Sequence, residues 1–555
     1  MRLTMKYYIA INLTLLFVSS LLISYGVAEA KDTRPNVLII VTDDMGFSDW
    51  GSFGGEIRTP NLDKLADEGI RVTQFYTAPA CSPTRSMLMT GIDHHMVGIG
   101  TMGEIIQPNQ RGKPGYEGYI NDRAVTMTEL LRDSGYSTMM AGKWHLGEGI
   151  EQDPSRKGFE QSFALLQGGA SHFGDEWMLS ANYTPIYREN GKRVHLPADS
   201  YSSDFYTQKL IDWLKAKKDD RPFFAYLAFT APHDPLHVPD DWLDKYKGVY
   251  DSGYDELSKK RFAKMKKLGV IPKDTIQFQR PPFIPGWDEL SPEERKASAR
   301  AMELYASMIE NADYNLGRLF SVLKELKVYD NTIIIFFSDN GANGLTMADY
   351  PNTDQAWVER NSDNRYENLG KRGSRIAVGP GWALASMTPF RMFKAFISEG
   401  GIRSPLIISG PRVEYAGEIS HVVADTRDVM PTVLDYANIA HPEQYKSRKV
   451  LPMQGRSMLP FLSKKAKSIH APDKVFAFEF LGLRGIRQGD WKATWISHPF
   501  GTSEWQLFNL SQDLGETRDI FQEHPDRLNK LIELWNQYAE EVGVILPEQP
   551  LLKVP

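Results

Sequence analysis

The only cysteine of this 555-residue chain lies in the stretch Cys81-Ser-Pro-Thr-Arg-Ser-Met-Leu-Met-Thr-Gly91. Pro83 fits the first turn of a helix, and Gly91 can end a helix in a left-handed conformation. The pattern predicts a short helix with Cys81 just ahead of it, where unpaired backbone N–H groups favour an anion. Arg85 adds a fixed charge and a fork of donors suited to a tetrahedral oxyanion. A lone cysteine is usually a small buried side chain, but this polar context favours a chemical role.

Other polar residues follow apolar runs that are typical of buried strands, at residues 36–42, 137–141, 222–229 and 332–337. The polar residues after these runs are Asp43, Asp44, Lys143, His145, His233, Asp339 and Asn340. Helical patterns alternate with the runs, which predicts an α/β fold with a large, mostly parallel sheet flanked by helices. Ligands bind beyond the carboxyl ends of such strands. We therefore expect these polar residues to gather at one edge of the sheet.

Four of these residues offer only oxygen ligands: Asp43, Asp44, Asp339 and Asn340. A single aspartate is more often a helix cap or a turn residue. Two pairs after two buried strands instead predict a metal site, and hard oxygen donors favour Ca²⁺, with Mg²⁺ as the second choice. The absence of histidine from this set argues against a zinc phosphatase.

Basic residues are expected at the same edge. Arg85, Lys143 and Lys394 together with a divalent cation outweigh the three aspartates, so the site favours an anion and charge that develops on a leaving group. His145 and His233 are candidates for proton transfer. His94 and His95 follow no predicted strand, and we interpret them as structural.

The elements that position these residues have clear signals. Helices are predicted at residues 59–69, 126–135, 206–215 and 292–326, and further strands at 70–76 and 404–409. Residues 245–287 and 350–385 read as surface excursions, the second near the site. After about residue 440 short strands follow at 475–481, 483–488, 491–496 and 505–510, and an amphipathic helix at 525–541. We therefore predict a catalytic domain at 31–440 and a smaller C-terminal α+β domain with an antiparallel sheet at 441–555.

The amino terminus predicts export. Arg2 and Lys6 precede an apolar run, and Ala28-Glu-Ala30 has the form of a cleavage site, so residues 1–30 are predicted to be a cleaved signal peptide. A retained membrane anchor is the alternative, because the run approaches the length that spans a bilayer. We expect an exported bacterial protein, periplasmic or secreted, without stable membrane insertion. A net charge of −6 and the lack of a basic run argue against nucleic acid as a partner.

Two stretches resemble the signatures of the type I sulfatases. Cys81-Ser-Pro-Thr-Arg85 with Thr90-Gly91 resembles the first signature, and Gly135-Tyr-Ser-Thr-Met-Met-Ala-Gly-Lys143-Trp-His145 resembles the second. The Asp43-Asp44 pair, Ala231-Pro-His233 and Asp339-Asn340 come in the order and spacing of that family, and the whole chain looks most like bacterial arylsulfatases. Thr84 stands where many members carry serine. The resemblance implies the fold of the alkaline-phosphatase superfamily.

The resemblance also implies roles. Cys81 would be oxidised to Cα-formylglycine by a separate formylglycine-generating enzyme, and the aldehyde hydrate would be the nucleophile. Asp43, Asp44, Asp339 and Asn340 would hold Ca²⁺, with Asp339 as the base. Lys143 and Lys394 would hold the sulfate group, His233 with Lys394 would protonate the leaving alcohol, and Arg85 with His145 would hold the formylglycine hydroxyls.

The implied activity is hydrolysis of a sulfate monoester of a small molecule or a glycan, by a monomer. One alternative is a formylglycine-dependent phosphonate monoester or phosphodiester hydrolase, which would use the same nucleophile and metal. Another is a non-catalytic protein that binds sulfated glycans. The sequence does not identify the alcohol that carries the sulfate.

Overall fold

The computed structural model describes residues 32–175, 179 and 183–548, so the predicted signal peptide lies outside the described residues. The chain divides into two units. The smaller comprises Met1–Thr33 and Asp219–Arg221, in which Arg221 and Asp219 form an ion pair of 3.2 Å. The larger comprises Arg34–Lys218 and Pro222–Pro555 and contains the described helices and strands. No helix in the described part of the chain is both long and apolar enough to cross a membrane.

Within the described residues the largest sheet has ten strands in the order β10-β2-β9-β8-β1-β7-β3-β4-β5-β6. In chain order these are β1 (Asn36–Thr42), β2 (Ile70–Tyr76), β3 (Ser137–Lys143), β4 (Gln161–Leu165), β5 (Tyr187–Glu189), β6 (Lys192–Val194), β7 (Phe223–Ala228), β8 (Thr332–Ser338), β9 (Arg403–Ser409) and β10 (Glu418–Asp425). The central strands β8, β1, β7, β3 and β4 are parallel, whereas β9 runs antiparallel to both β8 and β2. The predicted α/β sheet is therefore confirmed as a mixed sheet.

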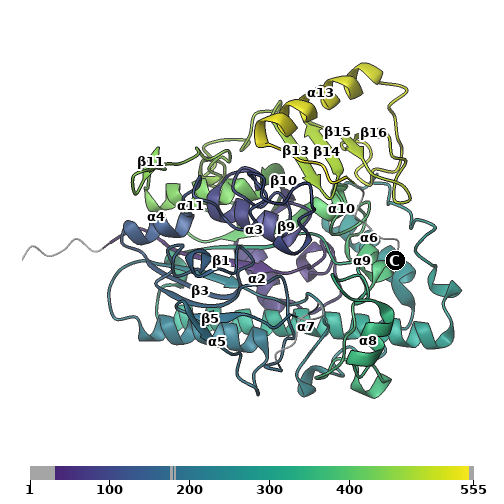
Figure 1. Ribbon diagram of the computed structural model, residues 1–555, viewed down its shortest axis with the longest axis horizontal. Coiled ribbons are helices and arrows are strands. Elements are labelled where there is room, and N and C mark those ends of the chain that lie inside the picture. The colour runs from purple at the N-terminus through teal and green to yellow at the C-terminus, as the bar shows by residue number, and fades with distance from the viewer. Residues whose placement is uncertain (1–31, 176–178, 180–182, 549–555) are drawn as a thin grey trace, which may run out of the picture. The chain divides into compact units, whose positions relative to one another are not determined.

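Helices cover both faces of this sheet (Figure 1). Successive residues of β1 point to opposite faces, and Leu38 and Ile40 pack into one core while Val37, Ile39 and Val41 pack into the other. The first core includes side chains of α2 (Pro60–Glu68), α5 (Ser202–Ala216), α7 (Pro292–Glu325) and α9 (Pro380–Ser386). The second includes side chains of α3 (Cys81–Thr90), α4 (Met127–Asp133), α11 (Val429–Ala437) and α12 (Leu459–Leu462). Because both faces are covered, the central strands are continuous apolar runs.

A second, four-stranded antiparallel sheet lies near the carboxyl end, with β13 (Val475–Phe480), β14 (Leu483–Gln488), β15 (Trp491–Trp495) and β16 (Trp505–Asn509) in that order. Helix α13 (Pro525–Val542) packs Leu528, Leu531 and Trp535 against it (Figure 1). These strands and this helix match the prediction. The boundary at residue 440 remains a prediction.

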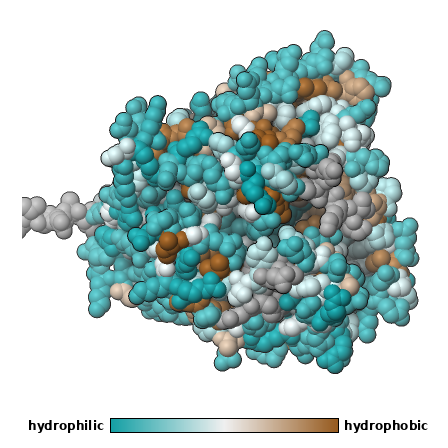
Figure 2. Space-filling view, viewed as in Figure 1, coloured by the Kyte–Doolittle hydropathy of each residue, from teal (hydrophilic) through white to brown (hydrophobic). Residues whose placement is uncertain are grey.

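The remaining elements lie in the connections. They are α6 (Gly253–Leu268) in the first predicted excursion, α8 (Gln355–Asn361) in the second, α10 (Glu399–Ile402) before β9, and the paired strands β11 (Gln444–Tyr445) and β12 (Arg448–Lys449). The face of the molecule in Figure 2 is mainly hydrophilic, with apolar residues in separate patches.

Gly69 is the C-cap of α2, at the predicted end of this helix, and its extended φ of −129° and ψ of −155° lead directly into β2. One local prediction needs correction. Helix α3 begins at Cys81 itself, with Ala80 as the N-cap, so Cys81 is the first helical residue. Gly91 ends this helix with a φ of 66°, as predicted.

Candidate active site

The carboxyl ends of four neighbouring parallel strands form the site. Strands β8, β1, β7 and β3 lie side by side in the sheet, so the residues that follow them come together at one edge. Asp43 and Asp44 follow β1, and Asp339 and Asn340 follow β8. Lys143 ends β3, and His145 and His233 lie shortly after β3 and β7.

Lys394 reaches the same edge by a different route. It precedes β9, whose amino end lies here because β9 is antiparallel to β8. Backbone hydrogen bonds fix its segment: Lys394 N donates to Ala342 O at 3.0 Å, and Ala395 N donates to Pro79 O at 2.8 Å. The second bond ties this segment to the residues just before α3.

Cys81 lies at the centre of the group. Its Sγ is 3.4 Å from Asp43 Oδ1 and 3.9 Å from Asp44 Oδ1, and the residue is 1% exposed. Thr84 Oγ1 accepts a hydrogen bond of 2.9 Å from Ala78 N, which fixes the turn into α3. Burial raises the pKa of the Cys81 thiol well above its usual value, although the lysines nearby work in the opposite direction. As an unmodified residue, Cys81 is therefore a thiol and a poor nucleophile.

Each of the six charged residues of this edge belongs to a short ion pair. Lys143 Nζ lies 2.7 Å from Asp43 Oδ2, Lys394 Nζ lies 2.8 Å from Asp44 Oδ2, and Arg85 Nη2 lies 2.8 Å from Asp339 Oδ2. All six side chains are at most 8% exposed. With one cation for each carboxylate, their formal charges cancel.

Burial and neighbouring charges shift the pKa values of this group. Burial alone would raise the pKa of Asp44, but Lys394, His233 and Lys143 outweigh it and hold that pKa well below its usual range. Burial lowers the pKa of His233 to about 3, in spite of the Asp44 charge, so its imidazole is neutral near pH 7. His233 Nε2 lies 3.4 Å from Lys394 Nζ, a geometry that lets the two share a proton.

The oxygen atoms of this edge fit a divalent cation. Asn340 donates from Nδ2 to Asp44 Oδ1 at 2.6 Å, but its Oδ1 is buried and has no hydrogen-bond partner among the described residues. A buried acceptor without a partner is costly. Asp43 and Asp44, with Cys81 and His233, place potential ligand atoms within 4.8 Å of one another. Carboxylate and amide oxygens suit Ca²⁺ or Mg²⁺.

Several residues of this edge have a left-handed backbone without being glycine. Asp44 has a φ of 65°, His145 of 57° and Ala395 of 74°. Such conformations persist where the surroundings impose them, and they cluster at functional sites. At Asp44 the next turn is fixed by Asp49, whose Oδ2 accepts a 2.7 Å hydrogen bond from Gly46 N.

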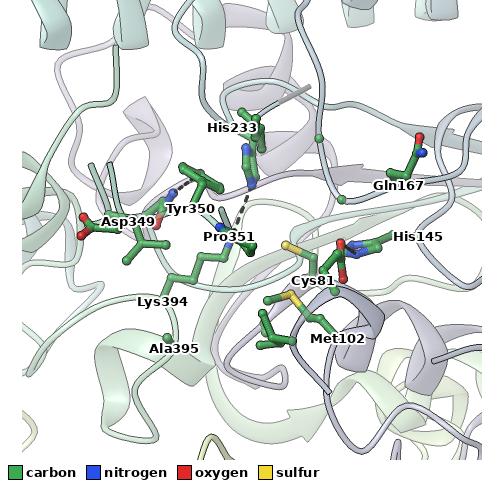
Figure 3. A pocket seen from close by; sticks show the side chains of 18 of the residues that line it. Cys81, Met102, His145, Gln167, His233, Asp349, Tyr350, Pro351, Lys394 and Ala395 are labelled. Carbon is green, nitrogen blue, oxygen red and sulfur yellow. Dashed lines mark hydrogen bonds and ion pairs between the residues drawn. The ribbon is translucent and has the colours of Figure 1, made fainter. Parts of the chain in front are cut away.

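The site opens into a cavity of about 390 Å³ (Figure 3). Cys81 lies between His145 on one side and Lys394 and His233 on the other, and all four side chains line the cavity. Asp43, Asp44, Arg85, Lys143, Asp339 and Asn340 lie beneath it, in contact with one another. The structure thus brings together all ten residues singled out in the sequence.

Sequence reasoning missed several residues of the site. Glu104 Oε1 lies 2.7 Å from His145 Nε2, yet Glu104 belongs to a three-residue 3₁₀ helix, Gly103–Ile105, with no recognisable sequence pattern. Tyr226 OH accepts a 3.2 Å hydrogen bond from Arg85 Nη1, and its position inside the apolar run of β7 gave no signal. Asp234 accepts a hydrogen bond of 3.0 Å from Tyr350 OH. It directly follows His233 in the sequence, and this adjacency could have identified it as a residue of the site.

His94 and His95 do not line the cavity. His95 is buried between Asp93 and Glu479, at 3.1 Å from each, and these carboxylates raise the pKa of His95 to about 9 although burial opposes them. Glu479 belongs to β13, so this ion pair joins the loop after α3 to the small sheet.

The site combines a cysteine at the amino end of a helix with lysines and paired carboxylates at the edge of an α/β sheet. This set of side chains is expected of an enzyme that acts on an anionic ester. The Sulfatase family model matches residues 35–439. The chain therefore belongs to the sulfatase family, which consists of hydrolases.

Two relatives show how far the similarity extends. The chain is 43% identical over 537 residues to an uncharacterized sulfatase of Schizosaccharomyces pombe, and the alignment covers 93% of this chain and 95% of the relative. It is 40% identical over 455 residues to an arylsulfatase of Klebsiella aerogenes, and the alignment covers 81% of this chain and 97% of the relative.

Solved structures share the fold. The crystal structure of Ps i-CgsB in complex with k-i-k-neocarrahexaose superposes with a TM-score of 0.65 at 24% identity and covers 91% of this chain and 93% of that one. The phosphonate monoester hydrolase of Agrobacterium radiobacter superposes with a TM-score of 0.53 at 18% identity, over 92% and 95% of the two chains. At these identities the likeness concerns the fold alone.

Proposed function

We propose that this chain is a sulfuric ester hydrolase of the arylsulfatase type, which cleaves a sulfate monoester to an alcohol or phenol and sulfate. The observation that carries the proposal is the position of Cys81, at the amino end of α3 and 3.4 Å from Asp43, where it lines a cavity together with Lys394, His145 and His233. The 40% identity to an arylsulfatase supports it.

Two groups would complete the site. Cα-formylglycine formed from Cys81 would supply a nucleophilic hydroxyl when hydrated. Ca²⁺, or Mg²⁺ as the second choice, would supply positive charge for sulfate oxygens and would be held by Asp43, Asp44, Asp339 and Asn340. The unpartnered Asn340 Oδ1 and the all-oxygen donor set fit such an ion.

The chain's own residues then bind, orient and move protons. Lys143 and Lys394 hold the sulfate oxygens, because both ammonium groups lie at the edge where Cys81 lies. The Lys394–His233 pair delivers a proton to the leaving oxygen. Arg85 and His145 orient the side chain at position 81, and Asp339 accepts its proton.

The maturation route follows from burial. Cys81 is 1% exposed in the folded chain, so we propose that a formylglycine-generating enzyme acts on it before folding is complete. We further propose that residues 1–30 direct export to the periplasm or medium, and that the mature protein is a monomer.

The mass of the tryptic peptide Val72–Arg85, from protein purified out of its native host, tests this proposal. An aldehyde at position 81, detected as loss of the sulfur, together with hydrolysis of p-nitrophenyl sulfate that disappears in Cys81→Ala, is the expected result. An unmodified thiol throughout an inactive sample would overturn it.

The rival phosphonate or phosphodiester activity is tested with matched sulfate and phosphonate esters, and a rate preference for the latter would replace the proposal. A non-catalytic binding protein would keep its glycan affinity in Cys81→Ala.

A further inference from the structure

The cavity has a charged floor and an apolar wall. Apolar side chains that line it include Met102, Ile105 and Ile106 from the segment after α3, Leu179 from the segment between β4 and β5, Leu345 from the segment after β8, Phe480 at the end of β13 and Leu481 just after it. Apolar surface that remains open to a cavity favours an apolar ligand.

The charged side chains of the wall are mainly acidic. Among the described lining residues Lys394 is the only lysine or arginine, and Asp44 already pairs with it at 2.8 Å. The carboxylates of Glu148 and Asp349 also line the cavity, as does that of Glu104, which pairs with His145 at 2.7 Å. A substrate with a second anionic group beyond its reacting sulfate would meet these carboxylates and no unpaired cation within the described wall.

The small sheet supplies a fixed part of this wall. Leu481, with a φ of 55°, and Gly482, with a φ of 86°, form the turn between β13 and β14. Gly482 N donates to Glu479 Oε1 at 2.8 Å, while Glu479 Oε2 lies 3.1 Å from His95 Nε2. The buried His95–Glu479 pair thus holds this turn against the loop that leads to Met102.

From these observations we infer that the enzyme selects monoanionic sulfate esters of apolar alcohols, aryl or alkyl, over sulfated sugars, and that Phe480 and the Leu481–Gly482 turn determine this selectivity. The inference rests on the proposed function, since it names the substrate class of the same site. A sugar would place hydroxyl groups against apolar side chains and lose hydrogen bonds to water. A disulfated sugar would add repulsion from the wall.

The test compares kcat/KM for four esters, using protein that carries the aldehyde. Hexyl sulfate and glucose 6-sulfate are both primary alkyl sulfates, so their leaving groups differ little in chemistry. We expect hexyl sulfate to be preferred by about 10-fold or more, and glucosamine 2-N,6-O-disulfate to react a further ~10-fold more slowly. p-Nitrophenyl sulfate separates an aryl from an alkyl preference. An equal or higher rate for glucose 6-sulfate would overturn the inference, whereas no hydrolysis of any ester would overturn the proposed function.

The variant Leu481→Lys tests the role of the turn. Leu481 is partly exposed to the cavity, so a lysine can extend into it. We expect the preference for hexyl sulfate over the disulfated sugar to fall by about 10-fold. The same substitution at Leu326, which is 37% exposed at the end of α7 and does not line the cavity, is the control. Ile106→Lys provides a second position on the same wall, and an unchanged preference in both wall variants would overturn the assignment.

Discussion

Two buried ionic clusters in this molecule look alike and differ in what surrounds them. The first, here the edge cluster, consists of Asp43, Asp44, Arg85, Lys143, Asp339 and Lys394. The second, here the interface cluster, consists of Glu399, Arg403, Lys492 and Glu516. Both contain short ion pairs between almost fully buried side chains. Burial and pairing alone therefore do not identify a site.

The two clusters differ in whether they lie next to a cavity and in whether they contain a hydrogen-bond acceptor that has no partner. In the interface cluster Lys492 Nζ lies 2.8 Å from Glu399 Oε1 and 2.9 Å from Glu516 Oε1, and these residues line no described cavity. Burial alone would raise the pKa of Glu399, but Lys492 and neighbouring arginines lower it to about 2. The edge cluster instead lies beneath a cavity and holds the unpartnered Asn340 Oδ1. The interface cluster therefore joins β15 to α10, whereas the edge cluster is available for chemistry.

The largest effect is expected from breaking the interface cluster. Lys492→Met leaves two carboxylates buried without their shared cation, so the free energy of unfolding should fall by about 3–5 kcal/mol. Urea denaturation measures this change, and kcat/KM of the folded fraction should stay close to wild type. Lys464→Met removes an exposed ion pair with Glu418 and should change stability by less than ~1 kcal/mol. A loss of kcat/KM in folded Lys492→Met would break the distinction between the clusters.

Breaking the edge cluster should act on the reaction. Lys394→Met removes the ammonium group that lies 2.8 Å from Asp44 and lines the cavity, so kcat/KM for p-nitrophenyl sulfate should fall by about 10²–10³-fold. The control Arg391→Met changes a cation three residues away that hydrogen-bonds Gln506 at 3.0 Å and does not line the cavity. Equal losses in the two variants would show that local folding, rather than charge at the site, is responsible.

The two clusters also show what sequence can and cannot predict. The edge cluster could be predicted for the most part because β1 and β8 are continuous apolar runs and parallel strands bring their carboxyl ends together. Lys394 was harder to place, since strand propensity does not reveal that β9 runs antiparallel and so presents its amino end here. Glu104 was missed because a three-residue 3₁₀ helix is too short to show a periodicity. The interface cluster depends on contacts between segments far apart in the chain, such as Glu399 and Lys492, which no local pattern encodes.

Metal binding would sharpen the comparison, because only the edge cluster has an unpartnered acceptor that fits a cation at the cavity. Asn340→Ala removes this amide oxygen, so the affinity for Ca²⁺ should fall by about 10–100-fold. Calorimetric titration of chelator-treated protein measures the affinity, and Ca²⁺ should raise the melting temperature of the wild type more than that of the variant. Asn361→Ala, at the exposed end of α8, is the matched control. Wild-type protein without measurable Ca²⁺ or Mg²⁺ affinity would contradict the assigned ligands.

The smallest effect is expected at Glu104, which orients a neighbour of the edge cluster. Glu104 Oε1 lies 2.7 Å from His145 Nε2, so Glu104→Gln should weaken the hold on the imidazole and lower kcat/KM by about 10-fold near pH 7. Glu104→Asp should recover part of this loss. Glu148→Gln, which changes a carboxylate that also lines the cavity, should have a smaller effect.

A pH-dependent stability measurement separates this positioning role from a simple packing role. The side chain of Glu104 is 33% exposed, and its partial desolvation raises its pKa, but the charge and hydrogen bond of His145 outweigh this effect and lower that pKa to about 2, below the ordinary value of 4.5. The ionised carboxylate therefore stabilises the fold above about pH 4.5, and this contribution disappears as the pH falls toward 2. The difference in unfolding free energy between wild type and Glu104→Gln should be larger near pH 6 than near pH 3. A pH-independent difference would mean that Glu104 only fills space, and the charged coupling to His145 would then be wrong.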